Sequence, residues 1–283
     1  MRTIRTFALL AVAAAVMMSS VRAEEAWQTL PPWPPLPPAA ETAYAPVNDI
    51  EMYYAVYGAG EPLILLHGGL GHSDVWGNQI PALAERFKVI TADSRGHGRS
   101  TRSAQPYSYA LMASDVLALM DHLKIEKASI LGWSDGGIIG IDIAINHPER
   151  LNRLFAFGAN VNVAGLRSDI ADSAVFNKYI EVAGQDYVRL SKTPKEYDAF
   201  VAQIGEMWAT QPNYTPEQLG KITTPVAIAD GEHDEGIRQE HNTEMANAIP
   251  GAKLVILKGV SHFAFVQKPD EFNQAALDFL LAK

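Results

Sequence analysis

One serine of the chain lies in a sequence context that suits a nucleophile. Ser134 occupies the middle of Gly132-Trp133-Ser134-Asp135-Gly136, between an apolar stretch at residues 127–131 and a long apolar helical pattern. A serine hydroxyl is a weak nucleophile, so a tight turn from strand to helix has to lift it toward a base and toward N–H donors. Side chains at the flanking positions would clash in such a turn, which explains Gly132 and Gly136. Because so short a run also arises by chance, the alternative is a serine in an ordinary turn.

A serine nucleophile needs a base, and the base needs a carboxylate that orients it. Asp234 follows an apolar stretch at residues 225–229, and His262 follows another at residues 253–257. The carboxyl ends of parallel strands share one edge of an open sheet, so Ser134, Asp234 and His262 are expected to meet there. The sequence therefore predicts a triad of nucleophile, orienting carboxylate and general base.

Two other acids compete with Asp234. Asp230 and Glu232 lie in the same turn, but Asp230 ends the preceding strand and is expected to be structural. A metal site on Asp230, His233 and Asp234 is a less favoured alternative, because no further ligand stands at a suitable spacing.

His262 is preferred as the base because, of the eight histidines, it alone follows the last predicted strand. His67 and His97 lie beside glycines in loops, where hydrogen bonds within the scaffold are expected. Surface or helix-end positions are expected for His122, His147, His233 and His241. The surroundings of His72 are left open.

Two backbone N–H groups are expected to stabilise the oxyanion of acyl transfer. The first belongs to Asp135, directly after the nucleophile and at a helix N-terminus. The second is assigned to Gly69 in the glycine-rich turn 67–71, where the backbone can approach a substrate closely.

Regular alternation of strands and helices would position these residues. Residues 52–57 alternate like an antiparallel strand, and further strands are expected at 62–66, 87–92, 128–131, 151–157, 225–229 and 253–257. Helices are expected at 109–123, 137–146, 238–248 and 269–282. This pattern is typical of an α/β fold with a mostly parallel sheet and helices on both faces, over residues 46–283.

The segment between residues 157 and 225 departs from that alternation. Its apolar spacing predicts helices at 168–183, 185–190, 194–208 and 216–220. An insertion of this size is too long for a plain loop. We expect a helical cap at about residues 160–220, whose aromatic side chains mostly pack on the core while a few line the substrate pocket.

The composition excludes several classes of function. The chain has 283 residues and a formal net charge of −9, with 32 acidic and 23 basic residues, so nucleic acid is not an expected partner. It contains no cysteine, which rules out a thiol nucleophile, a zinc–thiolate site and disulfides.

The first 23 residues have the pattern of a secretory signal peptide. Arg2 and Arg5 precede an apolar stretch at residues 7–18, and Ala23 ends a small-residue cleavage site. The stretch is shorter than the roughly 20 residues that span a bilayer, so cleavage is expected rather than a permanent anchor. The mature chain is therefore expected in the periplasm or secreted, without a stable membrane anchor.

Residues 24–45 are rich in proline. The run Pro31-Pro32-Trp33-Pro34-Pro35 favours extended polyproline II structure. We expect a tail or spacer before the folded domain, and a peptide ligand for a partner domain is the less favoured alternative.

Five motifs follow one another in a fixed order: His67-Gly68-Gly69, the loop at residues 93–100, the turn around Ser134, Gly231 with Asp234, and Gly259 with His262. In this order they resemble the α/β-hydrolase superfamily over residues 50–281. The resemblance implies an α/β-hydrolase fold and a serine hydrolase.

Within the superfamily, the run at residues 132–137, followed later by Gly158-Ala159-Asn160, resembles the valacyclovir-hydrolase-like group. In that group the Asp after the nucleophile receives the α-amino group of an amino-acid ester. The resemblance thus implies a substrate-binding carboxylate at Asp135, and the alternative is that Asp135 only caps its own helix. The export signal and the Pro-rich segment depart from this group.

These residues predict a cofactor-free serine hydrolase that cleaves a small carboxylic ester or lactone through an acyl-enzyme, with amino-acid esters among the candidates. Alternatives on the same scaffold are a carbon–carbon bond hydrolase, a perhydrolase, and a non-catalytic small-molecule receptor. The acyl group, the alcohol and the oligomeric state are left open, because fold alone does not fix function.

Overall fold

The parallel strands of one sheet end at the edge where the predicted site residues lie. The computed structural model describes residues 24–282, so the predicted signal peptide lies outside the described residues. The sheet has eight strands in the order β1-β2-β4-β3-β5-β6-β7-β8. β2 pairs antiparallel with β1 and with β4, and the remaining pairs are parallel. The bounds are β1 Glu41–Val47, β2 Ile50–Tyr57, β3 Glu61–Leu66, β4 Phe87–Ala92, β5 Ala128–Trp133, β6 Leu151–Phe157, β7 Val226–Gly231 and β8 Lys253–Leu257.

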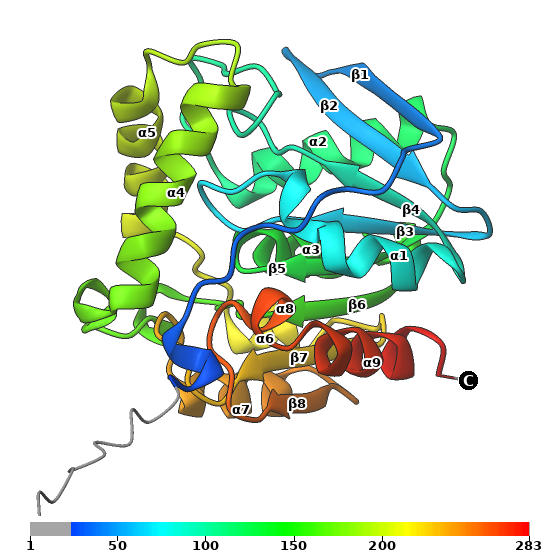
Figure 1. Cartoon of the computed structure of the whole chain (residues 1–283). Helices are drawn as coiled ribbons and strands as arrows, with labels where there is room; N and C mark the ends of the chain where they lie inside the picture. The colour runs from blue at the N-terminus through cyan, green and yellow to red at the C-terminus, as the bar shows by residue number, and fades with distance from the viewer. Residues whose placement is uncertain (1–23, 283) are drawn as a thin grey trace, which may run out of the picture.

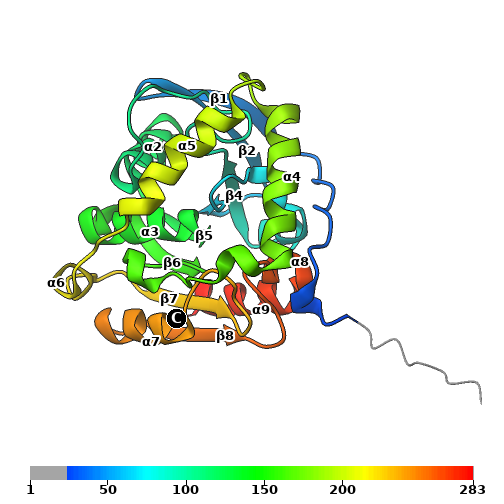
Figure 2. The ribbon, with the colours of Figure 1, turned by 90° about the vertical axis from the view of Figure 1, so that its left-hand side faces the viewer.

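Helices cover both faces of the sheet and its carboxyl edge. Figure 2 shows α2, α3 and α7 on one face and α8 and α9 on the other. In Figure 1 the arrowheads of β6 and β7 point toward α4, with α5 beside it, so these two helices form a cap over that edge. None of the helices within residues 24–282 combines the length and the apolar character needed to cross a bilayer. The bounds are α1 Gln79–Ala84, α2 Tyr109–His122, α3 Asp135–Asn146, α4 Ala174–Leu190, α5 Tyr197–Thr210, α6 Pro216–Leu219, α7 Gln239–Ala248, α8 Ala264–Gln267 and α9 Pro269–Leu280.

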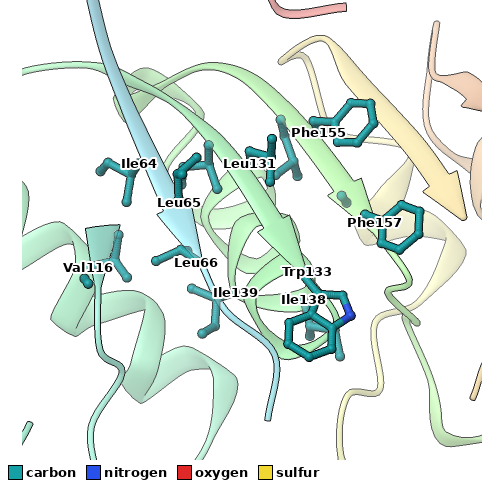
Figure 3. Packing of buried hydrophobic residues seen from close by; sticks show 14 of the residues in the cluster. Ile64, Leu65, Leu66, Val116, Leu131, Trp133, Ile138, Ile139, Phe155 and Phe157 are labelled. Atoms are coloured by element: carbon teal, nitrogen blue, oxygen red, sulfur yellow. The ribbon is translucent and has the colours of Figure 1, made fainter. Parts of the chain in front are cut away.

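The centre of the core lies around β5 and α3. Every residue of β5 is buried, as fits a strand covered on both faces. Figure 3 shows apolar side chains of β3, β5 and β6 packed with Ile138 and Ile139 of α3. Burying each large apolar side chain contributes about 1.5–3 kcal/mol. The turn between β5 and α3, which carries Ser134, is therefore held by a well-packed part of the molecule.

The fold class predicted from the sequence is confirmed, and the differences are local. The sequence did not predict β1, α1 or α8. The cap differs in that α4 runs without a break where two helices were expected on either side of Gly184. Gly184 lies inside this helix, where a Cβ atom would come within 3.2 Å of the ring of Tyr197 on α5.

The Pro-rich segment is not a free tail or spacer, which corrects that expectation. We call residues 24–40 the strap; it runs along the molecule between α4 and α8 in Figure 1, and β1 begins directly after it at Glu41. Polyproline II has three residues per turn, so side chains three apart share one side of the chain. The strap packs this side against the core through Leu30, Trp33, Leu36 and Ala39.

Candidate active site

Ser134 stands on the strained turn that the sequence predicts. Its φ of 53° and ψ of −119° lie outside the usual regions, at a cost of about 1–3 kcal/mol that the surrounding packing must supply. Its N–H donates to the carbonyl oxygen of Phe157 (2.7 Å), which ties the turn to β6. A side chain at Gly132 would collide with the backbone of Gly136, and one at Gly136 with the backbone of Leu66. The expected need for small flanking residues is confirmed.

His262 and Asp234 meet at the ends of β8 and β7. The Nδ1 of His262 lies 2.6 Å from Oδ2 of Asp234, and both side chains are buried. Burial lowers the pKa of His262, but the charge of Asp234 and the hydrogen bond raise it more, so the pKa lies above its usual value. Burial raises the pKa of Asp234, but the charge of His262 and the hydrogen bonds to the carboxylate together outweigh burial, so that this pKa is lowered. The other oxygen of Asp234 accepts the N–H groups of Gly236 (2.6 Å) and Ile237 (2.7 Å), which fixes the carboxylate.

The two competing acids lie elsewhere. Asp230 is fully buried, and it accepts hydrogen bonds from the N–H of Gly231 (2.8 Å) and the amide of Asn242 (2.5 Å). Burial and the charge of Asp234 raise the pKa of Asp230 well above its usual value, which favours the uncharged form of this carboxyl. Glu232 binds Lys258 (2.9 Å) at the surface. The structure thus places Asp234, and neither competitor, against His262.

Glu235 also supports His262, and sequence reasoning missed it. Its Oε2 accepts the backbone N–H of His262 (2.9 Å). Burial, followed by the charge of Asp234, raises the pKa of Glu235. Only its position directly after Asp234 hinted at this contact.

Ser134 and His262 open into one cavity of about 240 Å³ under the cap. Its walls are mostly apolar and come from β5, the cap and the loops around it: Trp133, Leu166, Ile170, Phe176, Tyr179, Trp208 and Ile237. Polar lining comes from Asp135, Asn160 and Gln211. A larger groove of about 610 Å³ lies behind Asp234 and includes neither Ser134 nor His262.

The two predicted N–H donors line the same cavity. Asp135 is the first residue of α3, so its N–H has no acceptor within the helix. No acceptor within residues 24–282 takes the N–H of Gly69. The carbonyl oxygen of Gly69 accepts the hydroxyl of Tyr179 (2.6 Å), a contact that the sequence did not indicate.

The carboxylate of Asp135 has partners on two other helices. It accepts the hydroxyl of Tyr109 from α2 (2.8 Å) and the indole N–H of Trp208 from α5 (3.0 and 3.1 Å to its two oxygens). Burial raises the pKa of Asp135 to about 6, although both hydrogen bonds oppose the shift. Neither alternative named for Asp135, ammonium binding or capping of its own helix, anticipated this link between core and cap.

The remaining histidines lie outside this cavity. His67 accepts the N–H of Ser94 (3.0 Å) and His97 contacts the carbonyl oxygen of Arg95 (2.9 Å), as expected of loop histidines. His241 lies in the first turn of α7, one of the two kinds of position expected for it, but its side chain is buried and accepts the N–H of Val161 (3.1 Å). Within residues 24–282 no three histidine or acidic side chains assemble a metal site.

Comparison with known proteins agrees with this geometry. Residues 61–193 match the family described as the alpha/beta hydrolase fold. RutD of Azorhizobium caulinodans, whose name describes a carbamate hydrolase, is 29% identical over 83% of this chain and 97% of its own length. The human serine hydrolase BPHL is 29% identical over 84% of this chain and 86% of its own.

Solved structures are similar as well. The enol-lactonase of Burkholderia xenovorans LB400 matches with a TM-score of 0.68 and 25% identity, over 84% of this chain and 99% of its own. Est816, described as an N-acyl homoserine lactone degrading enzyme, matches with a TM-score of 0.66 and 28% identity, over 82% of this chain and 98% of its own. With its sheet order, its strained serine turn and these relatives, the chain has the α/β-hydrolase fold and is a hydrolase.

Proposed function

We propose that the chain cleaves small carboxylic esters or lactones through an acyl-enzyme on Ser134. The observation that carries the proposal is the hydrogen-bonded pair of Asp234 and His262, which opens into the same cavity as the serine on its strained turn. A buried carboxylate against Nδ1 leaves Nε2 of the imidazole free to act as a base.

The first half of the reaction forms the acyl-enzyme. Oγ of Ser134 attacks the carbonyl carbon while Nε2 of His262 takes its proton, and Asp234 stabilises the resulting imidazolium. The carbonyl oxygen becomes an oxyanion that accepts the N–H groups of Gly69 and Asp135. The tetrahedral intermediate then collapses, the bond to the alcohol oxygen breaks, and His262 gives its proton to that oxygen.

The second half releases the acid. His262 takes a proton from a water molecule, whose oxygen attacks the acyl carbon. A second tetrahedral intermediate forms and breaks, the carboxylic acid leaves, and His262 returns the proton to Ser134. A lactone differs in that acid and alcohol leave as one hydroxy acid.

The cavity supports a small substrate with an apolar body. Its volume of about 240 Å³ lies below the range of drug-sized pockets, and aromatic and aliphatic side chains line most of it. The names of two structural relatives describe an enol-lactonase and an enzyme that degrades an N-acyl homoserine lactone, which supports lactones beside open-chain esters.

Amino-acid esters are a second candidate, favoured by one observation. The buried carboxylate of Asp135 lies in the cavity wall, where an α-ammonium group would find an opposite charge. The variant Asp135→Asn keeps the backbone N–H and removes only the charge. We expect KM to rise at least about 10-fold for a phenylalanine ester and to stay unchanged for the matching phenylpropionate ester; equal effects on both esters would contradict this candidate.

The decisive experiment compares Ser134→Ala with Ser114→Ala, which removes an exposed hydroxyl on α2. Turnover of p-nitrophenyl acetate should fall at least roughly 10³-fold in the first variant and stay unchanged in the second. A fluorophosphonate probe should label only proteins that keep Ser134. Full turnover by Ser134→Ala would overturn the proposal, as would cleavage of a β-diketone in the absence of ester or lactone cleavage.

We also propose that the chain is exported, on the pattern of residues 1–23. N-terminal sequencing of protein recovered from the periplasm or medium should give a start at Glu24. Recovery of the full-length chain in the cytoplasm alone would contradict export.

A further inference from the structure

The strap makes a specific polar contact with the cap. The indole N–H of Trp33 donates to Oδ2 of Asp186 on α4 (2.9 Å). The ring of Trp33 stacks on Phe265 of α8, with an interplanar angle of 13°. Trp33 thus fills the space between the cap and the face of the sheet that carries α8.

Asp186 gathers contacts from three segments. The same oxygen that accepts Trp33 lies 3.0 Å from Nε2 of His72, which directly follows the glycine-rich turn 67–71, and its other oxygen accepts the guanidinium of Arg189 (2.6 Å). Burial raises the pKa of Asp186, but these partners together lower it to about 2, so the carboxylate is ionised. A charged, partly buried acceptor makes these hydrogen bonds stronger than neutral ones.

Two turns earlier, α4 carries Tyr179 on the same side as Asp186, since residues seven apart lie on one face of a helix. Its buried hydroxyl donates to the carbonyl oxygen of Gly69 (2.6 Å). Trp33 meets the ring of Tyr179 edge-on, with 6.3 Å between the ring centroids. The strap therefore contacts α4 at both Tyr179 and Asp186.

The loop around Gly69 needs such an external contact. Gly69 has no side chain to restrict its backbone, and Leu70 after it has a φ of 62°, a region that is unfavourable for a leucine. The hydroxyl of Tyr179 restrains the peptide between these two residues. A misplacement of about 1 Å in a catalytic group costs up to about 100-fold in rate.

We propose that Trp33 and Tyr179 are positioning residues for the oxyanion site: Trp33 holds α4 in place, and Tyr179 on α4 holds the Gly69–Leu70 peptide. This contact fixes the orientation of Gly69, so that its N–H in the preceding peptide faces the reacting carbonyl. This inference rests on the proposed function. The strap, which precedes the α/β domain, would then affect the rate of the reaction through the position of α4.

The variant Tyr179→Phe tests the second link, with Tyr187→Phe as its matched control. Tyr187 lies on the same helix, is equally buried, and bonds through its hydroxyl to Thr193 (3.1 Å) rather than to the glycine loop. We expect Tyr179→Phe to lower kcat for p-nitrophenyl acetate 10- to 100-fold with KM within about 3-fold, and the control to keep wild-type kcat. The Ki of an aryl trifluoromethyl ketone, whose adduct with Ser134 carries an oxyanion, should rise by the factor by which kcat/KM falls.

The variant Trp33→Phe tests the first link, with Trp27→Phe as its control in the same strap. Trp27 stacks on His233 (4.5 Å between centroids), and within residues 24–282 neither a hydrogen bond nor a ring contact joins its side chain to α4. We expect Trp33→Phe to lower kcat 3- to 10-fold with the same rise in Ki, while Trp27→Phe keeps both values. In the double variant of Trp33 and Tyr179, kcat should fall by less than the product of the two single fold-changes, because both residues act on the position of the same Gly69–Leu70 peptide.

The outcomes separate this inference from the proposed function. Unchanged kcat and Ki in Tyr179→Phe, while Ser134→Ala is inactive, would overturn the inference alone. Losses that appear in melting temperature and KM but not in Ki would show a merely structural role and also overturn it. Should Tyr179→Phe fail to fold, the kcat and Ki of Trp33→Phe decide the matter.

Discussion

The carboxyl edge of the sheet and the cap contribute to the site in different ways. At the edge, Ser134, Asp234 and His262 each stand within a few residues of a strand end. Backbone groups hold Ser134 and Asp234, and the neighbouring carboxylates of Asp234 and Glu235 hold His262. The cap reaches the site through single side chains, namely Tyr179 on α4 and Trp208 on α5, which bond to residues far away in the sequence. The edge therefore supplies a geometry that the fold itself dictates, and the cap supplies contacts that each depend on one residue.

This difference separates chemistry from substrate choice. The strained serine turn and the pair of Asp234 and His262 are set by strand order and register, which leave little room for variation. The cavity walls come largely from the cap and from the segment between β6 and α4, which contributes Leu166 and Ile170. A changed side chain there alters the shape of the cavity without moving a strand. Substitutions at the edge are thus expected to affect rate or folding strongly. Substitutions in the cap are expected to act weakly or selectively, except at Tyr179, whose hydroxyl bonds to the glycine-rich turn of the oxyanion site.

The largest effect is expected for Asp234→Asn. The amide cannot stabilise the imidazolium and favours the wrong tautomer of His262, so kcat should fall roughly 10⁴-fold. Asp230→Asn is the matched control, because burial raises the pKa of Asp230 and so favours its uncharged form, and the amide oxygen of the variant can still accept the N–H of Gly231. Steady-state kinetics with p-nitrophenyl acetate should show less than about 3-fold loss in the control; similar losses in both variants would mean that the two carboxyls act as one unit.

Gly136→Ala should show how tightly the edge is packed. The new methyl group would run into the backbone of Leu66 in the central strand β3, which cannot move aside as a flexible side chain would. We expect the free energy of unfolding to fall by about 3 kcal/mol or more, measured as the midpoint of urea denaturation. A fall in the free energy of unfolding of less than about 1 kcal/mol would mean that the backbone at the edge can shift to fit a new side chain. The edge would then be no more rigid than the cap, contrary to the comparison above.

The same contrast explains what the sequence could predict. The triad was predictable because each member follows an apolar strand in an order that parallel topology brings to one edge. The partners of Asp135 and Gly69 were not, because Trp208 lies 73 residues from Asp135 and Tyr179 lies 110 residues from Gly69. Such pairs depend on how α4 and α5 cross the sheet, which no local pattern reveals.

The strap was misread for a related reason. Its prolines correctly predict an extended chain, but the apolar residues at every third position also give it a face to bury, and that periodicity was not used. Trp33 and Asp186 are 153 residues apart, so the contact itself lies beyond sequence reasoning. The apolar period of three was the signal that could have found it.

Asp135, where edge and cap meet, should make stability depend on pH. Its pKa is raised to about 6 in the folded chain by burial, from an ordinary value of 3.8. Between these values the folded chain binds more protons than the unfolded chain, so the free energy of unfolding falls as pH rises. The variant Asp135→Asn carries no titrating carboxyl at this position, so its free energy of unfolding should not fall in this way. Relative to wild type it should be more stable by up to about 3 kcal/mol above pH 6 and by little at pH 4.

Urea denaturation of both proteins from pH 4 to pH 8 measures this gain. The exposed substitution Asp278→Asn serves as the control and should give a difference that is small at every pH. A gain for Asp135→Asn that does not vary with pH would mean that the carboxyl stays ionised, held by Tyr109 and Trp208.

The smallest effect is expected in the cap itself, for Gly205→Ala. Gly205 lies inside α5, and a methyl group there would meet no atom within 4 Å. Alanine restricts the unfolded chain more than glycine does, so the variant should be more stable by about 0.5–1 kcal/mol, as measured by urea denaturation. Because the added methyl group would meet no neighbouring element, kcat should stay at the wild-type value. A lower kcat in this more stable variant would show that α5 must bend during turnover, and α5 would then take part in the reaction beside the edge of the sheet.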